Sequence, residues 1–131
     1  IEKNITLSND KVNADRLKKS IKISRLKSLI SKYSKQIKHK IKNSGIDLSG
    51  GQRQRIGIAR SLYVNRNIVF LDETTNALDS KTEEQILQEL KNEFKNKTVF
   101  IISHSKDLHM YVDRMINIKD GKIKILKTNA R

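Results

Sequence analysis

The stretch LSGGQRQRIGIARSLYVNRNIVFLDE, residues 48–73, contains a helix start followed by a short apolar strand. Ser49 and Gln52 are three residues apart, which is the spacing of a capping box, where each side chain bonds the backbone N–H of the other residue. This pair predicts a helix that begins near Gly50 and ends at about Tyr63. The buried face of this helix is expected to contain Ile56, Ala59 and Leu62.

The apolar run Ile68–Leu71 is short and continuous, which is typical of a strand buried on both faces. A second run of β-branched and apolar residues, Thr98–Ile102, predicts another strand. Between them, Ser80 and Glu83 have capping-box spacing and predict a second helix start. One side of that helix carries Ile86, Leu87, Leu90 and Phe94. Strand, helix and strand in this order predict a βαβ unit with a parallel sheet.

The residues on either side of this unit predict further helices and a hairpin. Residues 1–44 are expected to be helical, because apolar residues recur there at roughly helical spacing until Gly45 interrupts the pattern. These apolar residues are Leu17, Ile21, Leu26, Leu29 and Ile30. A short helical piece is expected around Lys106–Val112, and the turn Asp120-Gly121 predicts a hairpin. Its strands are expected at Arg114–Ile118 and Lys122–Leu126.

Together these patterns predict an α/β fold in a chain of 131 residues, enough for one domain or part of one. We expect a helical portion at residues 1–63, including the helix from Gly50, and an α/β portion at residues 64–131. The chain begins at Ile1 rather than Met, so we expect further residues upstream. It contains no apolar run long enough to cross a bilayer and no secretory signal pattern. The absence of cysteine excludes disulfides and cysteine-based zinc sites.

The formal net charge of +14 is unevenly distributed. Residues 1–44 contain 13 Lys and Arg against Glu2, Asp10 and Asp15, whereas the remaining residues contain 15 Lys and Arg against 11 Asp and Glu. A basic block of this kind is compatible with contact to nucleic acid or to an anionic membrane. We favour a solvated helical face, because the block has few aromatic residues suited to base stacking.

Polar residues follow both predicted strands of the parallel sheet, at the edge where ligands collect in such folds. Asp72 and Glu73 follow the first strand, and Ser103 and His104 follow the second. Asp72 suits contact with Mg²⁺, which prefers carboxylate and phosphate oxygens. Glu73 is then available to orient or deprotonate a water molecule, and His104 to contact a γ-phosphate. Each residue alone is also common without such a role, and their combination favours the functional interpretation.

The turn Ser49-Gly50-Gly51 is a second candidate site, because it precedes a predicted helix. At a helix N-terminus, unbonded N–H groups and the helix dipole both favour an anion, and glycine lets a ligand approach the backbone closely. An ordinary helix cap would carry the same residues. Taken alone, this turn does not separate phosphate binding from simple capping.

Four motifs of this chain resemble those of ABC ATPases, in the same order and at similar spacing. LSGGQRQRIGIAR (Leu48–Arg60) resembles the signature motif over its whole length, and IVFLDE (Ile68–Glu73) resembles the Walker B strand with its catalytic glutamate. NALD (Asn76–Asp79) matches the D-loop, and His104 matches the switch histidine. The segment Ile1–Ile5 resembles the stretch that follows the Q-loop in exporter-type domains. The chain is therefore similar to the C-terminal portion of an exporter-type ABC transporter ATP-binding domain.

The resemblance implies a partial P-loop NTPase fold of ABC type. A helical subdomain would be followed by the second half of a mostly parallel core sheet and a C-terminal hairpin. ATP and Mg²⁺ are the implied cofactors. Asp72 would serve Mg²⁺, Glu73 the attacking water, and His104 the γ-phosphate of the ATP in its own subunit. The residues implied to contact ATP held by the opposite subunit, or the dimer interface, are Ser49, Gly50, Gly51, Gln52 and Asp79.

ATP hydrolysis coupled to transmembrane transport is the function that the resemblance implies. The implied partners are a second ABC ATPase domain in a head-to-tail dimer and a transmembrane domain encoded upstream in the same chain; no nucleic acid is expected. The implied location is the cytoplasmic face of the cell membrane. The stretches TTNALD (residues 74–79) and ISHSKDL (residues 102–108) are similar to exporters and flippases of polysaccharides or lipid-linked sugars.

The sequence departs from the family in two places. The phosphate-binding pattern G-x-x-x-x-G-K-[ST] does not occur in the 131 residues, and the Q-loop glutamine and adenine-stacking aromatic residue would lie upstream of Ile1. We therefore expect the 131 residues alone not to hydrolyse ATP. Exporters often contact the membrane domain through a Gly-Glu-Arg-Gly-like stretch, of which Lys42-Asn43-Ser44-Gly45 keeps only the final glycine.

Two other functions remain open on the sequence alone. A truncated, non-catalytic chain could dock on a complete partner and present Ser49–Gly51 to the partner's ATP. An ATPase outside transport could bind nucleic acid through the basic first 44 residues, which steeply salt-dependent binding would reveal. The parent sheet takes strands from both halves of the domain. We therefore expect this chain to leave apolar faces uncovered and to be poorly soluble or dependent on a partner.

Overall fold

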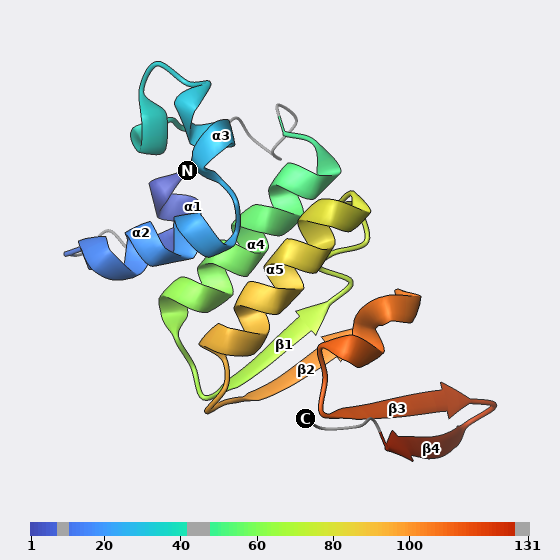
Figure 1. The fold of residues 1–131 in the computed structure, drawn as a ribbon. Coiled ribbons are helices and arrows are strands. Elements are labelled where there is room, and N and C mark those ends of the chain that lie inside the picture. The colour runs from blue at the N-terminus through green and yellow to red at the C-terminus, as the bar shows by residue number, and fades with distance from the viewer. Residues whose placement is uncertain (8–10, 42–47, 128–131) are drawn as a thin grey trace.

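The computed structural model describes residues 1–7, 11–41 and 48–127, and it places most of the helices before the strands (Figure 1). The first part contains α1 (Glu2–Thr6), α2 (Ala14–Ile23), α3 (Lys27–Ser31), the 3₁₀ helix η1 (Gln36–Lys38) and the long helix α4 (Gly50–Val64). The second part contains β1 (Ile68–Asp72), α5 (Ser80–Glu93), β2 (Thr98–Ile102), the 3₁₀ helix η3 (Lys106–Met110), β3 (Arg114–Lys119) and β4 (Lys122–Lys127). The predicted α/β fold is confirmed.

Helix α4 packs against the N-terminal helices on one side and the βαβ unit on the other. Its Ile56 and Ala59 belong to a buried cluster with residues of the N-terminal helices and their caps, namely Ile1, Ile5, Leu17, Leu26 and Leu29. Its Ile58 and Leu62 belong to a second cluster, with Ile23, Val69, Leu71, Ile86, Leu90 and Phe94. The predicted buried face of this helix is confirmed, with the fully buried Ile58 in addition. One helix therefore connects the two cores.

The helical pattern of the first third is divided into short helices. Asn13 caps α2 by accepting a hydrogen bond from the Arg16 N–H at 2.9 Å. Arg25 has a φ of 55°, which ends the helical path before α3. Of the predicted apolar pattern, the buried members are Leu17, Leu26 and Leu29, and the half-buried members are Ile21 and Ile30. The stretch Lys42–Gly45 lies outside the described residues. The predicted end of the helical pattern at Gly45 and the comparison with the Gly-Glu-Arg-Gly-like stretch both fall there.

Strands β1 and β2 pair in parallel, in register from Ile68 opposite Thr98 to Asp72 opposite Ile102. Helix α5 forms the connection between them, so the predicted βαβ unit is confirmed. The predicted apolar side of α5 is buried: Ile86, Leu90 and the following Phe94 pack in one cluster with residues of β1 and α4, and Leu87 is 3% exposed. The carboxyl ends of β1 and β2 therefore meet at one edge of the sheet.

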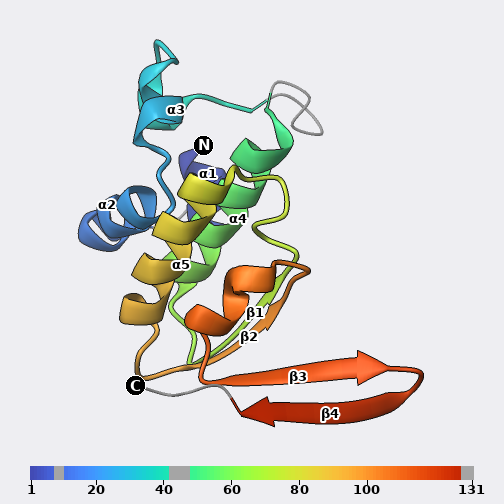
Figure 2. The same ribbon diagram turned by 45° about the vertical axis from the view of Figure 1, so that its right-hand side comes forward.

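The prediction that Ile68–Leu71 is buried on both faces is wrong. Val69 and Leu71 are buried against the helices, but Ile68 and Phe70 are 58% and 69% exposed. Figure 2 shows α4 and α5 on the same side of the sheet. On the other face, the rings of Phe70 and Phe100 stack with centroids 4.8 Å apart. An apolar run is buried on both faces only where two layers cover it, and the described residues leave this second face largely exposed.

Because this apolar face is exposed, we expect the 131-residue chain to self-associate. Replacing Phe70 and Phe100 together by Ser should raise its soluble fraction and lower its binding of a hydrophobic dye. Phe94→Ser is the matched control: Phe94 is 5% exposed in the core, so its loss should destabilise the fold by about 3 kcal/mol or more. A soluble fraction unchanged by the double substitution would show that this face does not drive association.

Helix α5 begins at Ser80, but its cap is not the predicted pair of Ser80 and Glu83. Asp79 is the N-cap residue, and its Oδ1 accepts a hydrogen bond from the Thr82 N–H at 3.0 Å. The Glu83 carboxylate instead accepts from the hydroxyl of the buried Thr75 at 2.8 Å. Asp and Ser both favour the N-cap position. The backbone at Asp79 is extended while Ser80 is already helical, and this decides between them.

The hydrogen bonds with Thr82 lower the pKa of Asp79 below the ordinary Asp value. Its contribution to stability is therefore complete above the pKa of the unfolded chain and is lost as the pH falls through the lower pKa of the folded state. Asp79→Ala should lose both the cap and this acid dependence, whereas Asp79→Asn should keep the cap and lose only the acid dependence. Thermal unfolding, followed from acid to neutral pH, measures both the loss of stability and its dependence on pH. An unchanged acid dependence in the Ala variant would exclude Asp79 as its source.

Strands β3 and β4 form the predicted antiparallel hairpin, with Lys119 opposite Lys122 next to the turn. Asp120 and Gly121 have φ values of 50° and 70°. A two-residue turn that matches the twist of its strands needs positive φ at both positions, and Asp-Gly meets that need. The predicted helical piece before the hairpin is the short 3₁₀ helix η3, which ends at Met110.

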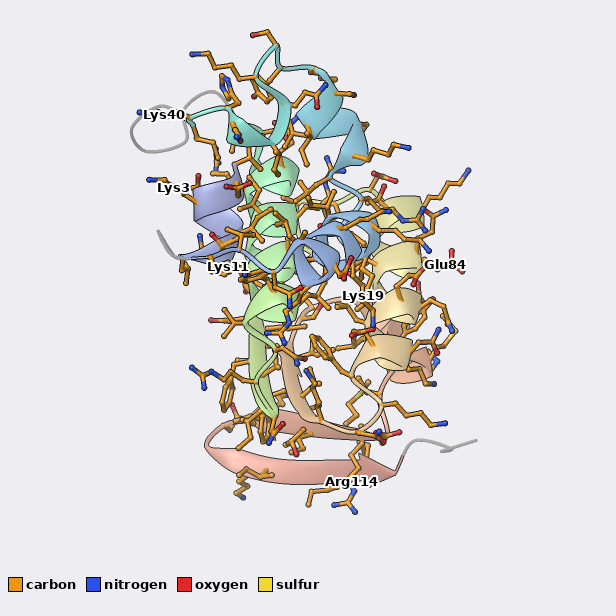
Figure 3. The ribbon with its side chains drawn as sticks, turned by 90° about the vertical axis from the view of Figure 1, so that its left-hand side faces the viewer. Lys3, Lys11, Lys19, Lys40, Glu84 and Arg114 are labelled. Carbon is orange, nitrogen blue, oxygen red and sulfur yellow. The ribbon has the colours of Figure 1, made fainter. Side chains whose placement is uncertain are left out.

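Lysine side chains are prominent on the helical part of the surface, where Figure 3 shows Lys3, Lys11, Lys19 and Lys40. Lys19 Nζ lies 2.6 Å from Glu93 Oε2 on α5. Exposed ion pairs of this kind contribute at most about 1 kcal/mol to stability. Within the described part of the chain, no helix has the length and apolar character needed to span a membrane.

Candidate functional site

Glu73 directly follows β1 and is held through its backbone from two sides. Its N–H donates to the carbonyl of Ile102, at the end of β2, over 2.9 Å. Its carbonyl accepts a hydrogen bond from Gln54 Nε2, on α4, also at 2.9 Å. The φ of Glu73 is 47°, a left-handed conformation that residues other than glycine seldom adopt. Strain of this kind persists only where surrounding contacts enforce it, and it clusters at functional sites.

The side chains of Glu73 and His104 meet at the carboxyl ends of β1 and β2. His104 Nε2 lies 3.4 Å from Glu73 Oε1, and the two side chains are 87% and 53% exposed. Parallel pairing explains this contact, because Asp72 and Ile102 are register partners and the next residues leave the sheet at the same edge. An acid–base pair open to solvent is therefore present at the edge where the sequence predicted ligands.

Asp72 is the last residue of β1, and it is exposed beside Glu73. The described ranges contain no group of three or more His, Cys, Asp or Glu side chains that could hold a metal ion. Mg²⁺ does not need such a cage, because proteins bind it through one or two carboxylates together with water and substrate phosphates. The Asp72 carboxylate therefore fits Mg²⁺ that arrives with a nucleotide.

Ser49 and Gln52 form the predicted capping box at the start of α4. Ser49 Oγ accepts from the Gln52 N–H at 3.3 Å, and Gln52 Oε1 accepts from the Ser49 N–H at 3.0 Å. The Ser49 hydroxyl keeps its own proton for donation. The N–H groups of Gly50 and Gly51 have no acceptor inside the helix, since they belong to its first turn. These donors and the helix dipole together fit the oxygens of a phosphate group.

Gly50 and Gly51 are also needed for packing against the loop of residues 73–79 in the same chain. A Cβ on Gly51 would lie 2.7 Å from the carbonyl oxygen of Ala77 and 3.2 Å from Leu78 Cδ2. A Cβ on Gly50 would lie 3.3 Å from Ala77 Cβ. Movement of a side chain cannot relieve the contact with the carbonyl oxygen. The start of α4 therefore lies directly against the Asn76–Asp79 segment, which the sequence did not reveal.

Gln54, which sequence reasoning did not single out, bridges Glu73 and Ala77 of this loop. Its Nε2 donates to the carbonyl of Glu73, and its Oε1 accepts from the Ala77 N–H, each at 2.9 Å. Thr75, in the middle of the loop, is bonded to Glu83 on α5. The partners of Gln54 are 19 and 23 residues away, so no local pattern marks it. The loop that carries Glu73 is thus braced by α4 and α5 together.

The sequence model of the ABC transporter family matches residues 1–76 of the chain. The chain belongs to the ABC transporter family. The matched residues of this family member include the start of α4, Gln54 and the Asp72-Glu73 pair.

Curated ABC transporters align with nearly all of this family member but are much longer. ABC transporter B family member 14 of Arabidopsis thaliana is 34% identical over 124 residues, which are 95% of this chain and 10% of that protein. The ATP-dependent lipid A-core flippase of Desulfotalea psychrophila is 33% identical over 123 residues, which are 94% of this chain and 22% of the flippase.

A solved structure confirms the same family and fold. A bacterial Atm1-family ABC exporter with ATP bound superposes with a TM-score of 0.85 at 26% identity, covering 94% of this chain and 22% of the exporter chain. The expected fold, part of an ABC-type ATP-binding domain, is therefore confirmed. The chain spans only 10% to 22% of the length of these three relatives.

Proposed function

We propose that this chain is part of an exporter-type ATP-binding domain that hydrolyses ATP to drive transport across a membrane. The observation that supports this function most is the placement of Glu73. Its backbone is fixed by Ile102 and Gln54, and its carboxylate lies 3.4 Å from His104 at an exposed strand end. A base that is held in place but open to a substrate is what water activation requires.

Three residues at the strand ends are proposed to act on one ATP. Glu73 orients and deprotonates the attacking water, and His104 contacts the γ-phosphate. Asp72 provides a carboxylate for the Mg²⁺ that arrives with the nucleotide. When bound, Mg²⁺ neutralises the charge that develops on the phosphate oxygens. The exposure of all three side chains leaves room for the nucleotide.

The start of α4 is proposed to act on a different ATP, held mainly by an opposite ATP-binding domain. Its capping box and unbonded N–H groups present donors to a phosphate. The residues assigned to this role are Ser49, Gly50, Gly51 and Gln52. Asp79 is assigned to contact across the interface between the two domains, which fits its place at the end of the loop that packs against Gly51.

The complete protein is proposed to contain further parts. Within the chain, we assign residues 1–63 to a helical subdomain and residues 64–131 to part of the α/β core. A second ATP-binding domain would pair with it head to tail, and a transmembrane domain would hold it at the cytoplasmic face of a membrane. The lengths of the Arabidopsis transporter and the Desulfotalea flippase support this assignment, since the chain covers 10% and 22% of them.

The test of this function compares the 131-residue chain with the complete protein, by which we mean this chain together with the segments that hold ATP phosphates. The chain has no G-x-x-x-x-G-K-[ST] pattern, so alone it is expected to show no ATP turnover. The complete protein is expected to hydrolyse ATP in a Mg²⁺-dependent way. Absence of that activity in the complete protein would contradict the proposed function. If the 131-residue chain alone hydrolyses ATP and Glu73→Gln abolishes this activity, then the chain does not need the other segments for hydrolysis, contrary to the prediction.

A further inference from the structure

We infer that Gln54 is a positioning residue that fixes Glu73 relative to the phosphate-facing start of α4, an inference that rests on the proposed function. Gln54 is half-buried, on the second turn of α4. Its two hydrogen bonds reach Glu73 and Ala77, at opposite ends of the turn that carries Glu73 away from β1. Gln54 itself touches no reacting atom in this arrangement and acts through the backbone of Glu73.

The carboxamide is suited to this role because it provides a donor and an acceptor in a fixed geometry. The Glu73 carbonyl needs a donor and the Ala77 N–H needs an acceptor, and both bonds are 2.9 Å long. A carboxylate could accept from Ala77 but would repel the Glu73 carbonyl. A methionine would fill a similar space and form neither bond.

The helical spacing of α4 places Gln54 on the same face as the two glycines. Gln54 follows Gly51 by three residues and Gly50 by four, so all three residues lie on the same face of the helix. That side lies against Ala77 and Leu78, because a Cβ on Gly51 would collide with the Ala77 carbonyl. The start of α4 and the Glu73 loop therefore form one packed unit, in which Gln54 supplies the directional bonds.

This unit links two roles in the same chain. The start of α4 is assigned to the ATP of the opposite domain, and Glu73 to the ATP of its own domain. Any shift of α4 on contact with a phosphate is passed through Gln54 to the carbonyl of Glu73. The Glu73 backbone is already in a left-handed conformation, φ 47°, so it depends on such bonds to keep its orientation.

Steady-state ATP hydrolysis by the complete protein tests the role of Gln54. Gln54→Met and Gln54→Glu are expected to lower kcat about tenfold, the effect of losing one or two hydrogen bonds, with the KM for ATP within about twofold. Gln88→Met and Gln88→Glu are the matched controls, because Gln88 is an exposed glutamine on α5. The control variants are expected to keep both constants.

Two further measurements test the inference: the melting temperature of Gln54→Met shows whether Gln54 only stabilises the fold, and the kcat of Glu73→Gln tests the proposed function separately. A Gln54→Met protein that melts earlier but keeps its kcat per folded molecule would overturn the inference, since it would show a structural role only. If Glu73→Gln lowers kcat while Gln54→Met and Gln54→Glu do not, the inference fails and the proposed function stands. If Glu73→Gln leaves hydrolysis unchanged, the proposed function fails first.

Discussion

The complete protein carrying Glu73→Gln is expected to hydrolyse ATP at least about a hundredfold more slowly than the unsubstituted protein, with its affinity for ATP retained. Glutamine has nearly the same shape as glutamate but cannot take a proton from the attacking water. The substitution leaves the backbone bonds of residue 73 to Ile102 and Gln54 intact, so the fold should not change. Phosphate release measures the rate, and equilibrium binding of nucleotide measures the affinity.

Glu84→Gln is the control for this loss. Glu84 is an exposed residue of α5, so the same chemical change there should leave kcat within about twofold. A Glu73→Gln protein with a kcat close to that of the control would show that another group activates water. A simultaneous loss of ATP affinity would instead place Glu73 in nucleotide binding.

Gly51→Ala is expected to have the second largest effect. The added Cβ would lie 2.7 Å from the Ala77 carbonyl oxygen, so either α4 or the 73–79 loop must move. Displacements on the order of 1 Å near a reacting group reduce rates by up to about a hundredfold. We therefore expect kcat to fall between about tenfold and a hundredfold, as measured by phosphate release.

The matched control is the same substitution six residues further along the same helix. A Cβ on Gly57 would meet no atom of the described residues within 4 Å. Because alanine favours a helix interior over glycine, Gly57→Ala should stabilise the fold by about 0.5–1 kcal/mol and leave kcat unchanged. Equal activity of the Gly51 and Gly57 variants would show that contact with Ala77 does not constrain the site.

Several elements with local signals were predicted correctly from the sequence. The capping box of Ser49 and Gln52 fixes the start of α4, since its two hydrogen bonds join residues three apart. The hairpin turn follows from Asp120-Gly121, because few other dipeptides accept two positive φ values. The meeting of Glu73 and His104 follows from parallel strand order, which the apolar runs indicate.

The features that depend on distant residues were not predictable in this way. The exposure of Ile68 and Phe70 depends on which layers cover the sheet. The sequence of a strand alone does not show whether one or both of its faces are covered. In the sequence, Gln54 looks like any other polar residue of a helix. Its role becomes visible only in the fold, where Glu73 and Ala77 lie next to it. The choice of Asp79 over Ser80 as cap depends on where the braced loop enters α5.

In the proposed mechanism, the start of α4 and Glu73 of one chain serve two different ATP molecules. This division of roles is tested with two differently tagged copies of the complete protein, purified as mixed pairs. Ser49→Arg blocks the start of α4 with a bulky side chain, and Glu73→Gln removes the base. When both substitutions lie in one copy, each ATP site contains one defect. When they lie in different copies, one site has both defects and the other has none.

The deciding measurement is the ATP hydrolysis rate of these two mixed pairs. The pair with the substitutions in different copies is expected to be clearly more active, reaching at most about half the unsubstituted rate because one site of two is intact. The pair with both substitutions in one copy should be nearly inactive. Equal rates, or a higher rate for the pair with both substitutions in one copy, would show that the start of α4 and Glu73 of one chain do not serve different ATP molecules.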